Sequence, residues 1–279
     1  LALNYLTRSG VGCRTGSKAS ADGDFGKSVT RARNHQNPIF LSNFVALDDE
    51  QERLRRELAH LQIHYAYKAE VVDNKADPLR IDIAEAIQAL ALFQNDPRFV
   101  VWLKKEPARL LDMETNQYKE LFPSTLSAIQ LANAVRFLRY VQSRATLEGR
   151  GVGPERLSYR HGNHAIGWVL AKRIKKEFQG AALLDDSKLT HNLSAPFDEL
   201  RQIHWIETQK RLYLKGPLAL FRNLTDTIPL LEAILIAYYG LGADPVVGYK
   251  RGQHIVGSPY PKELFDYLIS KAPQIGNLS

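Results

Sequence analysis

Cysteine is nearly absent from this sequence, with Cys13 the only one among 279 residues. A single cysteine excludes an internal disulfide and any zinc site built from several thiolates. It also favours a reducing compartment, so we expect a cytoplasmic protein. Long hydrophobic runs are lacking too. The most apolar stretch, residues 227–242, is interrupted by Pro229 and Glu232, and we expect no membrane-spanning segment.

Apolar residues recur at helical spacing through most of the sequence, which predicts a mainly α, multi-helical fold. A small extended element is expected at residues 62–68, where Ile63, Tyr65 and Tyr67 occupy alternate positions. Leu79 is expected to face the core from the second helix. We divide the chain into a polar, glycine-rich N-terminal segment at residues 1–40 and a helical domain at 41–279. Helices are predicted at residues 47–61, 77–93, 95–107, 124–148, 155–178, 195–214, 225–240 and 260–272.

Positive charge is concentrated in one part of the chain. The net charge is +7, and residues 136–176 alone hold ten Lys or Arg against two Glu, a net of +8. A surplus of this kind is typical of proteins that bind phosphates or nucleic acid. The alternative interpretation is a solvated helical face that happens to be rich in lysine and arginine. Both interpretations stay open at this point.

Residues 21–28, "ADGDFGKS", satisfy a loosened A-x4-G-K-S pattern and so resemble a nucleotide-binding loop. A true phosphate-binding loop follows a buried apolar strand, which the preceding "GCRTGSKAS" cannot form. Asp22 and Asp24 would also lie inside the cradle and repel the anion. We interpret this stretch as a glycine-rich turn and predict no nucleotide cofactor here.

A less conspicuous stretch, residues 29–70, carries a recognisable motif. It resembles the abortive infection phage resistance (AIPR) family, which has an "I/V-T-x-x-x-N-x-Q-N-x-I/V" element, an Asn/Asp-Phe step, a "L-D-x-x-Q-x-x-L" helix and an aromatic-basic strand. The residues that match are Asn34, Gln36, Asn37, Ile39, Asn43, Phe44, Leu47, Asp48, Gln51, Leu54, Tyr65, Tyr67 and Lys68. Weaker similarity continues through "YKELFP" at 118–123 and "RHGNHAIGWVL" at 160–170. The resemblance implies a role in bacterial anti-phage defence. It also implies an N-terminal α/β part, of which residues 1–40 would be the remnant.

The amides of this motif suggest contact with nucleic acid. Asn34, Gln36 and Asn37 offer donors and acceptors that can bind base edges, and Arg31 and Arg33 beside them can neutralise phosphates. The alternative is that the amides satisfy the polar backbone of a turn before the proline that follows. Together with the basic segment they give our predicted nucleic-acid-binding set: Arg31, Arg33, Asn34, Gln36, Asn37, Arg160, Lys172, Arg173, Lys175 and Lys176.

One arrangement suggests catalysis. Arg156 and His161 fit the R-x(4–6)-H pattern of HEPN-type ribonucleases, in which histidine is the general acid/base and arginine stabilises the charge of the transition state. Such a site needs no metal and is normally composed by two protomers, so this hypothesis implies a homodimer. Residues 55–60 fit the same pattern by chance, which makes the pattern a weak guide.

His161 and His164 form an H-x-x-H pair, which raises the question of a metal. Zinc takes three or four ligands, and only distant residues could complete the set, so we predict no metal site and no cofactor. The expected function is therefore anti-phage defence through nucleic acid, DNA or RNA, bound on a basic helical surface. The alternatives are a metal-independent, HEPN-like ribonuclease and a non-catalytic scaffold for a partner protein.

Overall fold

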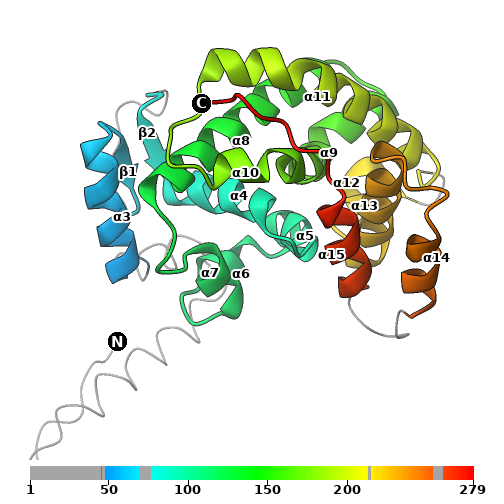
Figure 1. Ribbon diagram of the computed structural model, residues 1–279, viewed down its shortest axis with the longest axis horizontal. Helices are drawn as coiled ribbons and strands as arrows, with labels where there is room; N and C mark the ends of the chain where they lie inside the picture. The colour runs from blue at the N-terminus through cyan, green and yellow to red at the C-terminus, as the bar shows by residue number, and fades with distance from the viewer. Residues whose placement is uncertain (1–44, 46–47, 69–76, 213–214, 254–259) are drawn as a thin grey trace, which may run out of the picture. The chain divides into compact units, whose positions relative to one another are not determined.

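The computed structural model describes residue 45 and residues 48–68, 77–212, 215–253 and 260–279, and these form a helical body with one small sheet (Figure 1). The mainly α prediction is confirmed. The helices are α3 (Asp49–His60), α4 (Ile83–Phe93), α5 (Arg98–Lys105), α6 (Pro107–Leu111), α7 (Asn116–Leu121), α8 (Ala128–Glu148), α9 (Pro154–Ala171), the 3-10 turn η1 (Lys172–Ile174), α10 (Lys175–Phe178), α11 (Asp186–Gln209), α12 (Pro217–Leu220), α13 (Leu224–Tyr238), α14 (Pro245–Gly252) and α15 (Lys262–Ser270).

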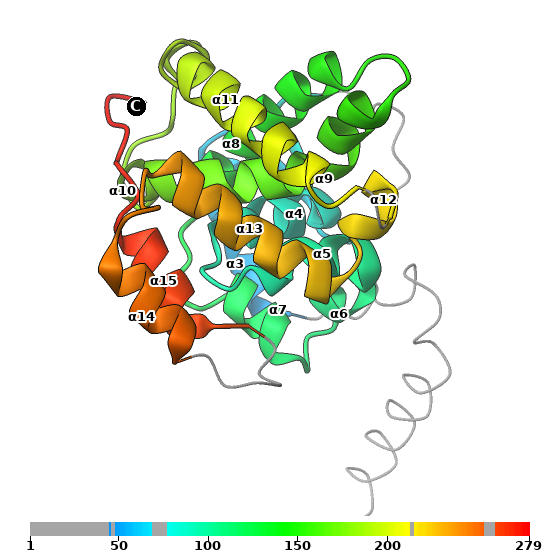
Figure 2. The same ribbon diagram turned by 90° about the vertical axis from the view of Figure 1, so that its right-hand side faces the viewer.

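The core is built around α8 and α9. Helix α8 packs on α4 and α9, and α11 covers α8 and α9 from the other side. Most of the α9 surface from Gly162 onward is buried, and Trp168 is fully enclosed. Close approach is possible because Gly167 has no side chain. A Cβ there would lie 2.9 Å from Leu92 and 3.2 Å from Val141. Helix α13 crosses the front of the body in Figure 2 and packs on α5, α9 and α11.

Local signals explain where the long helices begin. The sequence pattern predicts a helix from residue 124, but α8 begins at Ala128, because Ser127 and Gln130 form a capping box that satisfies free backbone N–H groups. Helix α11 begins nine residues before its predicted start, with the Asp185 carboxylate capping Lys188 N at 2.9 Å. Pro196 is accommodated inside this helix.

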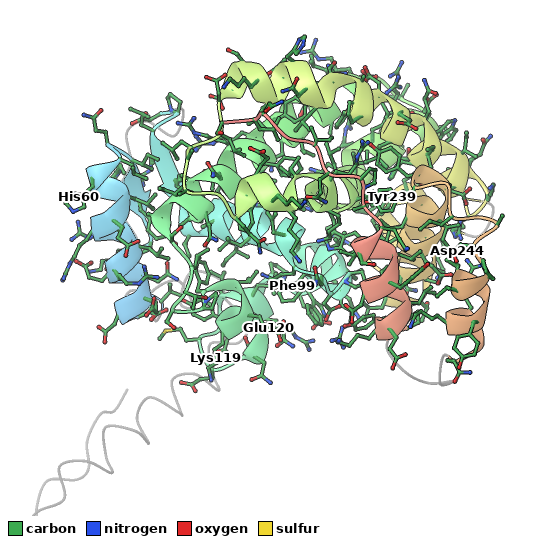
Figure 3. The ribbon with its side chains drawn as sticks, in the orientation of Figure 1. His60, Phe99, Lys119, Glu120, Tyr239 and Asp244 are labelled. Atoms are coloured by element: carbon green, nitrogen blue, oxygen red, sulfur yellow. The ribbon has the colours of Figure 1, made fainter. Side chains whose placement is uncertain are left out.

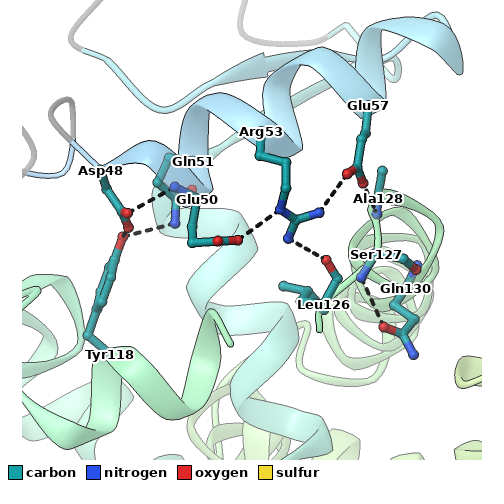
Figure 4. Close-up of polar contacts among 10 residues, drawn as sticks. All are labelled: Asp48, Glu50, Gln51, Arg53, Glu57, Tyr118, Leu126, Ser127, Ala128 and Gln130. Atoms are coloured by element: carbon teal, nitrogen blue, oxygen red, sulfur yellow. Dashed lines mark hydrogen bonds and ion pairs between the residues drawn. The ribbon is translucent and has the colours of Figure 1, made fainter. Parts of the chain in front are cut away.

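From Asp48 onward, the AIPR-like "L-D-x-x-Q-x-x-L" motif forms the N-cap and first turns of α3, and its polar residues hold that helix to the body (Figure 4). Asp48 caps α3 through Glu50 N at 3.0 Å and accepts a 2.6 Å hydrogen bond from Tyr118 Oη. The fully buried Gln51 donates to Tyr118 Oη at 2.9 Å and accepts from Tyr65 Oη at 2.5 Å. The motif therefore joins α3 to α7 and to the first strand. These residues have a structural role.

A second set of contacts fixes α3 to the start of α8. The Arg53 guanidinium pairs with Glu50 at 2.9 Å and Glu57 at 2.6 Å, and it donates to Leu126 O at 2.7 Å (Figure 4). Glu57 in turn accepts from Ala128 N, at the N-terminus of α8. One arginine thus links the motif helix to the segment that leads into α8.

The predicted extended element is confirmed as β1 (His64–Ala66), which pairs in parallel with β2 (Arg80–Asp82). This pairing corrects the helix predicted from residue 77. Residues 80–82 are extended, and α4 starts only at Ile83, capped by Asp82. Leu79 was expected in the core, but it is 50% exposed because it lies before the strand, outside the helical register.

A cationic pocket beside His161

Much of the positive charge in residues 136–176 is already used within the fold. Arg139 makes a two-pronged contact with Glu85 at 2.7 and 2.8 Å, and Arg144 pairs with Asp198 at 2.6 Å. Arg136 donates to Leu184 O. These guanidiniums connect α8 to α4, to α11 and to the segment that leads into α11, so their charge is matched or committed to a backbone carbonyl. The surplus available to a ligand is smaller than the sequence suggests.

Lys172 belongs to the interior. Its side chain is 2% exposed, its ammonium donates to Leu92 O at 3.0 Å and Gln94 O at 2.6 Å, and it lies 4.4 Å from the ring centre of Trp168. Burial lowers the pKa of this lysine, while the two carbonyls at the end of α4 and the indole face favour its charged form. Its predicted role in binding nucleic acid does not fit this burial, and we correct it to a cap on α4.

The neighbours of Lys172 are partly engaged as well. Arg173 donates to Pro273 O at 3.0 Å and Tyr238 Oη at 2.5 Å, and its own carbonyl accepts from Ile275 N at 2.6 Å. The predicted single helix at 155–178 is accordingly interrupted by η1, where the C-terminal segment crosses it. Lys175 is half-buried and Lys176 is exposed. Of the other predicted binding residues, Arg31, Arg33, Asn34, Gln36 and Asn37 lie outside the described residues.

The two catalytic candidates do not meet within one chain. Five residues along a helix correspond to about 140° around its axis. Accordingly, Arg156 borders one surface pocket, with Trp205 and Leu212, while His161 borders another. Arg156 also donates to the Glu148 carbonyl at 2.8 Å and lies 3.5 Å from its carboxylate. Because it borders a different pocket, Arg156 does not assist His161 in the same protomer.

The pocket at His161 has a volume of about 670 Å³. Its lining comes from the C-terminal end of α5, the first half of α9 and the α12 segment. Helices α5 and α12 both pack on α9 (Figure 2). We call this cavity the His161 pocket. Its lining residues are Lys105, Leu157, His161, Gly216, Pro217, Leu218, Ala219, Arg222 and Asn223. This set, drawn from the described part of the chain, contains two permanent cations and no Asp or Glu.

Four cationic side chains line the His161 pocket or act on His161 electrostatically, and we call Lys104, Lys105, Arg160 and Arg222 the cationic cluster. Arg160 is exposed and donates to Gly149 O at 3.0 Å. Lys105 is half-exposed and has Glu106 at 3.5 Å, a loose surface pair worth little. Arg222 is exposed, and among the described residues its guanidinium has no hydrogen-bond or ion-pair partner.

Lys104 is the most buried member of this cluster. Its ammonium has only a 3.5 Å contact with Asn163 Oδ1 within the described residues. Burial, and then the positive charge of Arg222, lower the pKa of Lys104 to about 8. Half-buried charges in proteins usually have a counter-charge close by. Here the neighbouring charge has the same sign.

His161 lies in the positive field of three members of the cluster. Partial burial, followed by Lys104, Arg160 and Arg222, lowers the pKa of its imidazole, so the neutral form is favoured near neutral pH. The other histidine of the H-x-x-H pair points elsewhere: His164 is buried, and its Nε2 lies 3.2 Å from Gln88 Oε1. Among the residues described, no three His, Cys, Asp or Glu side chains converge on a point that could hold a metal.

Sequence reasoning found His161 and Arg160 but missed Lys104, Lys105 and Arg222. The dipeptide "KK" at the end of the predicted helix at 95–107 was a weak signal, because basic residues commonly occupy the last turn of a helix. Arg222 stands alone between two helices, without a local signal. Only the packing of α5 and α12 on α9 brings these cations together.

Comparison with known proteins identifies the family. The family model of the AIPR protein matches residues 11–211, and the chain belongs to this family. Membership indicates a role in abortive infection, that is, in resistance to phage. No curated protein and no solved structure matches the chain. No helix in the described part of the chain is both long and apolar enough to cross a membrane.

Proposed function

We propose that this AIPR-family protein acts in anti-phage defence by binding nucleic acid, and that the His161 pocket with its cationic cluster is the contact site for phosphates. The observation that carries the proposal is that, among the described residues, Lys104 and Arg222 have no counter-charge. The positive charges of Lys104 and Arg222 repel each other, and the pocket lining drawn from the described residues contains no carboxylate. A phosphate group would supply the missing negative charge. A cytoplasmic site of action is part of the proposal, since phage nucleic acid is accessible there.

The cluster also has an extension along the surface. Arg150 is exposed and follows Gly149, whose carbonyl accepts the hydrogen bond from Arg160. The exposed positive side chains near the start of α9 therefore continue from the pocket toward the α8–α9 turn. A row of this kind suits a strand with several phosphates better than a single small anion. Lys175 and Lys176 lie beyond the opposite end of α9 and are secondary in this proposal.

Binding of labelled single- and double-stranded DNA and RNA to the full chain, measured by fluorescence anisotropy, tests the proposal. Charge reversal by Arg222→Glu removes one cation and adds a carboxylate to the pocket, so we expect affinity to fall at least tenfold for the preferred nucleic acid. The matched control is Lys119→Glu. Lys119 extends from α7 into solvent and does not line the pocket (Figure 3). Lys119→Glu should weaken binding less than threefold.

Three results would overturn the proposal or its assignment of the site. One is the absence of binding to all four nucleic acids at low salt. Another is an equal loss of affinity in Arg222→Glu and Lys119→Glu, which would reflect net charge alone. A third variant, Lys175→Glu/Lys176→Glu, identifies the competing location. If it abolishes binding while Arg222→Glu has no effect, the contact site lies at α10 and the pocket assignment is wrong.

A second candidate function is metal-independent ribonuclease activity at His161, and one observation favours it. The cationic field favours a neutral imidazole, the form that accepts a proton from an attacking hydroxyl. The arginine that stabilises the transition state would be Arg160 or Arg222, or Arg156 of a second protomer in a homodimer. We expect such an activity to persist in EDTA and to disappear in His161→Ala. Cleavage that is unchanged in His161→Ala would exclude this site.

A further inference from the structure

We infer that the His161 pocket holds one nucleotide unit at a time, with a terminal phosphate against Lys105 and Arg222 and the nucleoside against an apolar wall. The inference rests on the proposed function and makes its ligand more specific. The shared chemistry is a nucleoside monophosphate, either free or at the end of a strand. It follows from three features of the pocket, which are its size, its division into an apolar and a cationic part, and the state of His161.

The size of the pocket fits a ligand of this class. Small-molecule sites commonly enclose about 300–1,000 Å³, and the His161 pocket measures about 670 Å³. A site that only tracks a phosphate backbone needs a shallow basic surface and no cavity. The presence of a cavity among these cations therefore indicates a ligand with a body as well as a charge.

The lining is divided in the way that an amphipathic ligand requires. Leu157, Pro217, Leu218 and Ala219 form the apolar wall, and Leu218 remains 42% exposed although it is a large aliphatic side chain. A base and sugar placed on this wall would cover it. Asn223 also lines the pocket, although its Oδ1 already caps the first turn of α13 through Thr225 N at 3.0 Å.

The cationic part contains more charge than one phosphodiester needs. Lys105 and Arg222 line the pocket directly, while Lys104 and Arg160 act on His161 from α5 and α9. An internal phosphodiester carries one negative charge, whereas a terminal phosphate carries about 1.5 to 2 near neutral pH. A terminal phosphate matches this concentration of cations better than an internal one.

His161 adds a proton-linked property. In the empty pocket its pKa is lowered by burial and by Lys104, Arg160 and Arg222. A phosphate beside the ring would favour the imidazolium, so binding takes up a proton. Affinity should therefore rise as pH falls toward 6, and this rise should be weaker in His161→Gln. The comparison of the two proteins removes the contribution of the phosphate's own titration.

The test uses isothermal titration calorimetry on the full chain with 5′-AMP, GMP, CMP and UMP. We expect at least one to bind, and we expect adenosine or the corresponding nucleoside and inorganic phosphate each to bind at least tenfold more weakly. Arg222→Glu and Leu218→Glu should each reduce nucleotide affinity at least tenfold, because they change opposite parts of the pocket. Lys119→Glu serves again as the control that should leave affinity unchanged.

Short oligonucleotides with and without a 5′- or 3′-terminal phosphate identify the source of the nucleotide. Competition between a phosphorylated strand and the mononucleotide supports strand ends, and mononucleotide binding without competition supports a free nucleotide. The inference is overturned if no mononucleotide binds and terminal phosphates make no difference. Strand binding that stays sensitive to Arg222→Glu would in that case leave the proposed function intact, so the two failures are distinguishable.

Discussion

Replacing the buried amide of Gln51 by an apolar side chain of similar size tests the structural role of the family motif. In the native structure Gln51 Oε1 accepts from Tyr65 Oη at 2.5 Å, and Gln51 Nε2 donates to Tyr118 Oη at 2.9 Å. Gln51→Leu keeps a similar side-chain volume and removes both of these hydrogen bonds. Tyr118 retains its 2.6 Å hydrogen bond to Asp48, but Tyr65, which is 1% exposed, loses its bond to Gln51.

The expected cost follows from that one stranded hydroxyl. A buried polar group left without a partner costs about 1–3 kcal/mol, so we take roughly 2 kcal/mol for Gln51→Leu. For a domain of this size each kcal/mol corresponds to about 2–4 °C in Tm, which gives a fall of roughly 4–8 °C. The double variant Gln51→Leu/Tyr65→Phe removes the stranded hydroxyl as well. It should recover more than half of the loss.

Thermal unfolding followed by far-UV circular dichroism measures both variants against the parent chain. The decisive quantity is the difference between the single and double variants, because it isolates the stranded group from other effects of the substitution. A double variant that is less stable than Gln51→Leu by the full cost of a second independent mutation would refute this reasoning. So would a Gln51→Leu variant with unchanged Tm.

Three further predictions concern buried groups. Burial lowers the pKa of His164 and His204 to about 3, whereas the unfolded chain titrates near 6.5. The free energy of unfolding should therefore fall as pH drops below 6.5, by up to about 1.4 kcal/mol per pH unit for each imidazole. A Tm that does not change between pH 7 and 5 would contradict this. Gly162→Ala should lower Tm in the same thermal scan, because the new Cβ would lie 2.7 Å from Phe221. Overpacking costs about 1–3 kcal/mol, which we expect to outweigh the gain in helix propensity of about 1 kcal/mol. A higher Tm would show that the Phe221 ring moves aside without cost. Lys172→Met should lower Tm and leave nucleic-acid affinity unchanged in the anisotropy assay, because the Lys172 ammonium donates hydrogen bonds to buried carbonyls. Weaker binding at unchanged Tm would show that Lys172 belongs to the binding surface.

The helical body was predictable because its signals are local. Apolar spacing predicted the long helices that became α8 and α9, and alternation predicted the strand at Tyr65. The start of α4 was predicted too early, at residue 77 instead of Ile83, because nothing within residues 77–82 shows that residues 80–82 pair with a strand 16 residues earlier. Helix propensity was outweighed there by a tertiary contact.

The site was only half predictable for the same reason. His161 and Arg160 attracted attention through a motif and a local surplus of charge. Lys104 and Arg222 come from segments far away in the sequence, and only their packing on α9 places them near His161. Conversely, Lys172 was assigned to the basic surface, because its neighbours along the chain give no sign that its side chain is buried. Charge counts locate surplus charge, but they do not distinguish a free cation from a buried cap.

The most direct test of the central claim is the salt dependence of nucleic-acid affinity in the parent chain and in Lys105→Ala/Arg222→Ala. Each phosphate contact contributes roughly 0.7–0.9 to the slope of log affinity against log salt concentration. If these two cations hold phosphates, the double variant should have a slope smaller by roughly 1.4–1.8. An unchanged slope, with Kd equal to that of the parent at every salt concentration, would contradict the assignment of the His161 pocket as the phosphate-binding site.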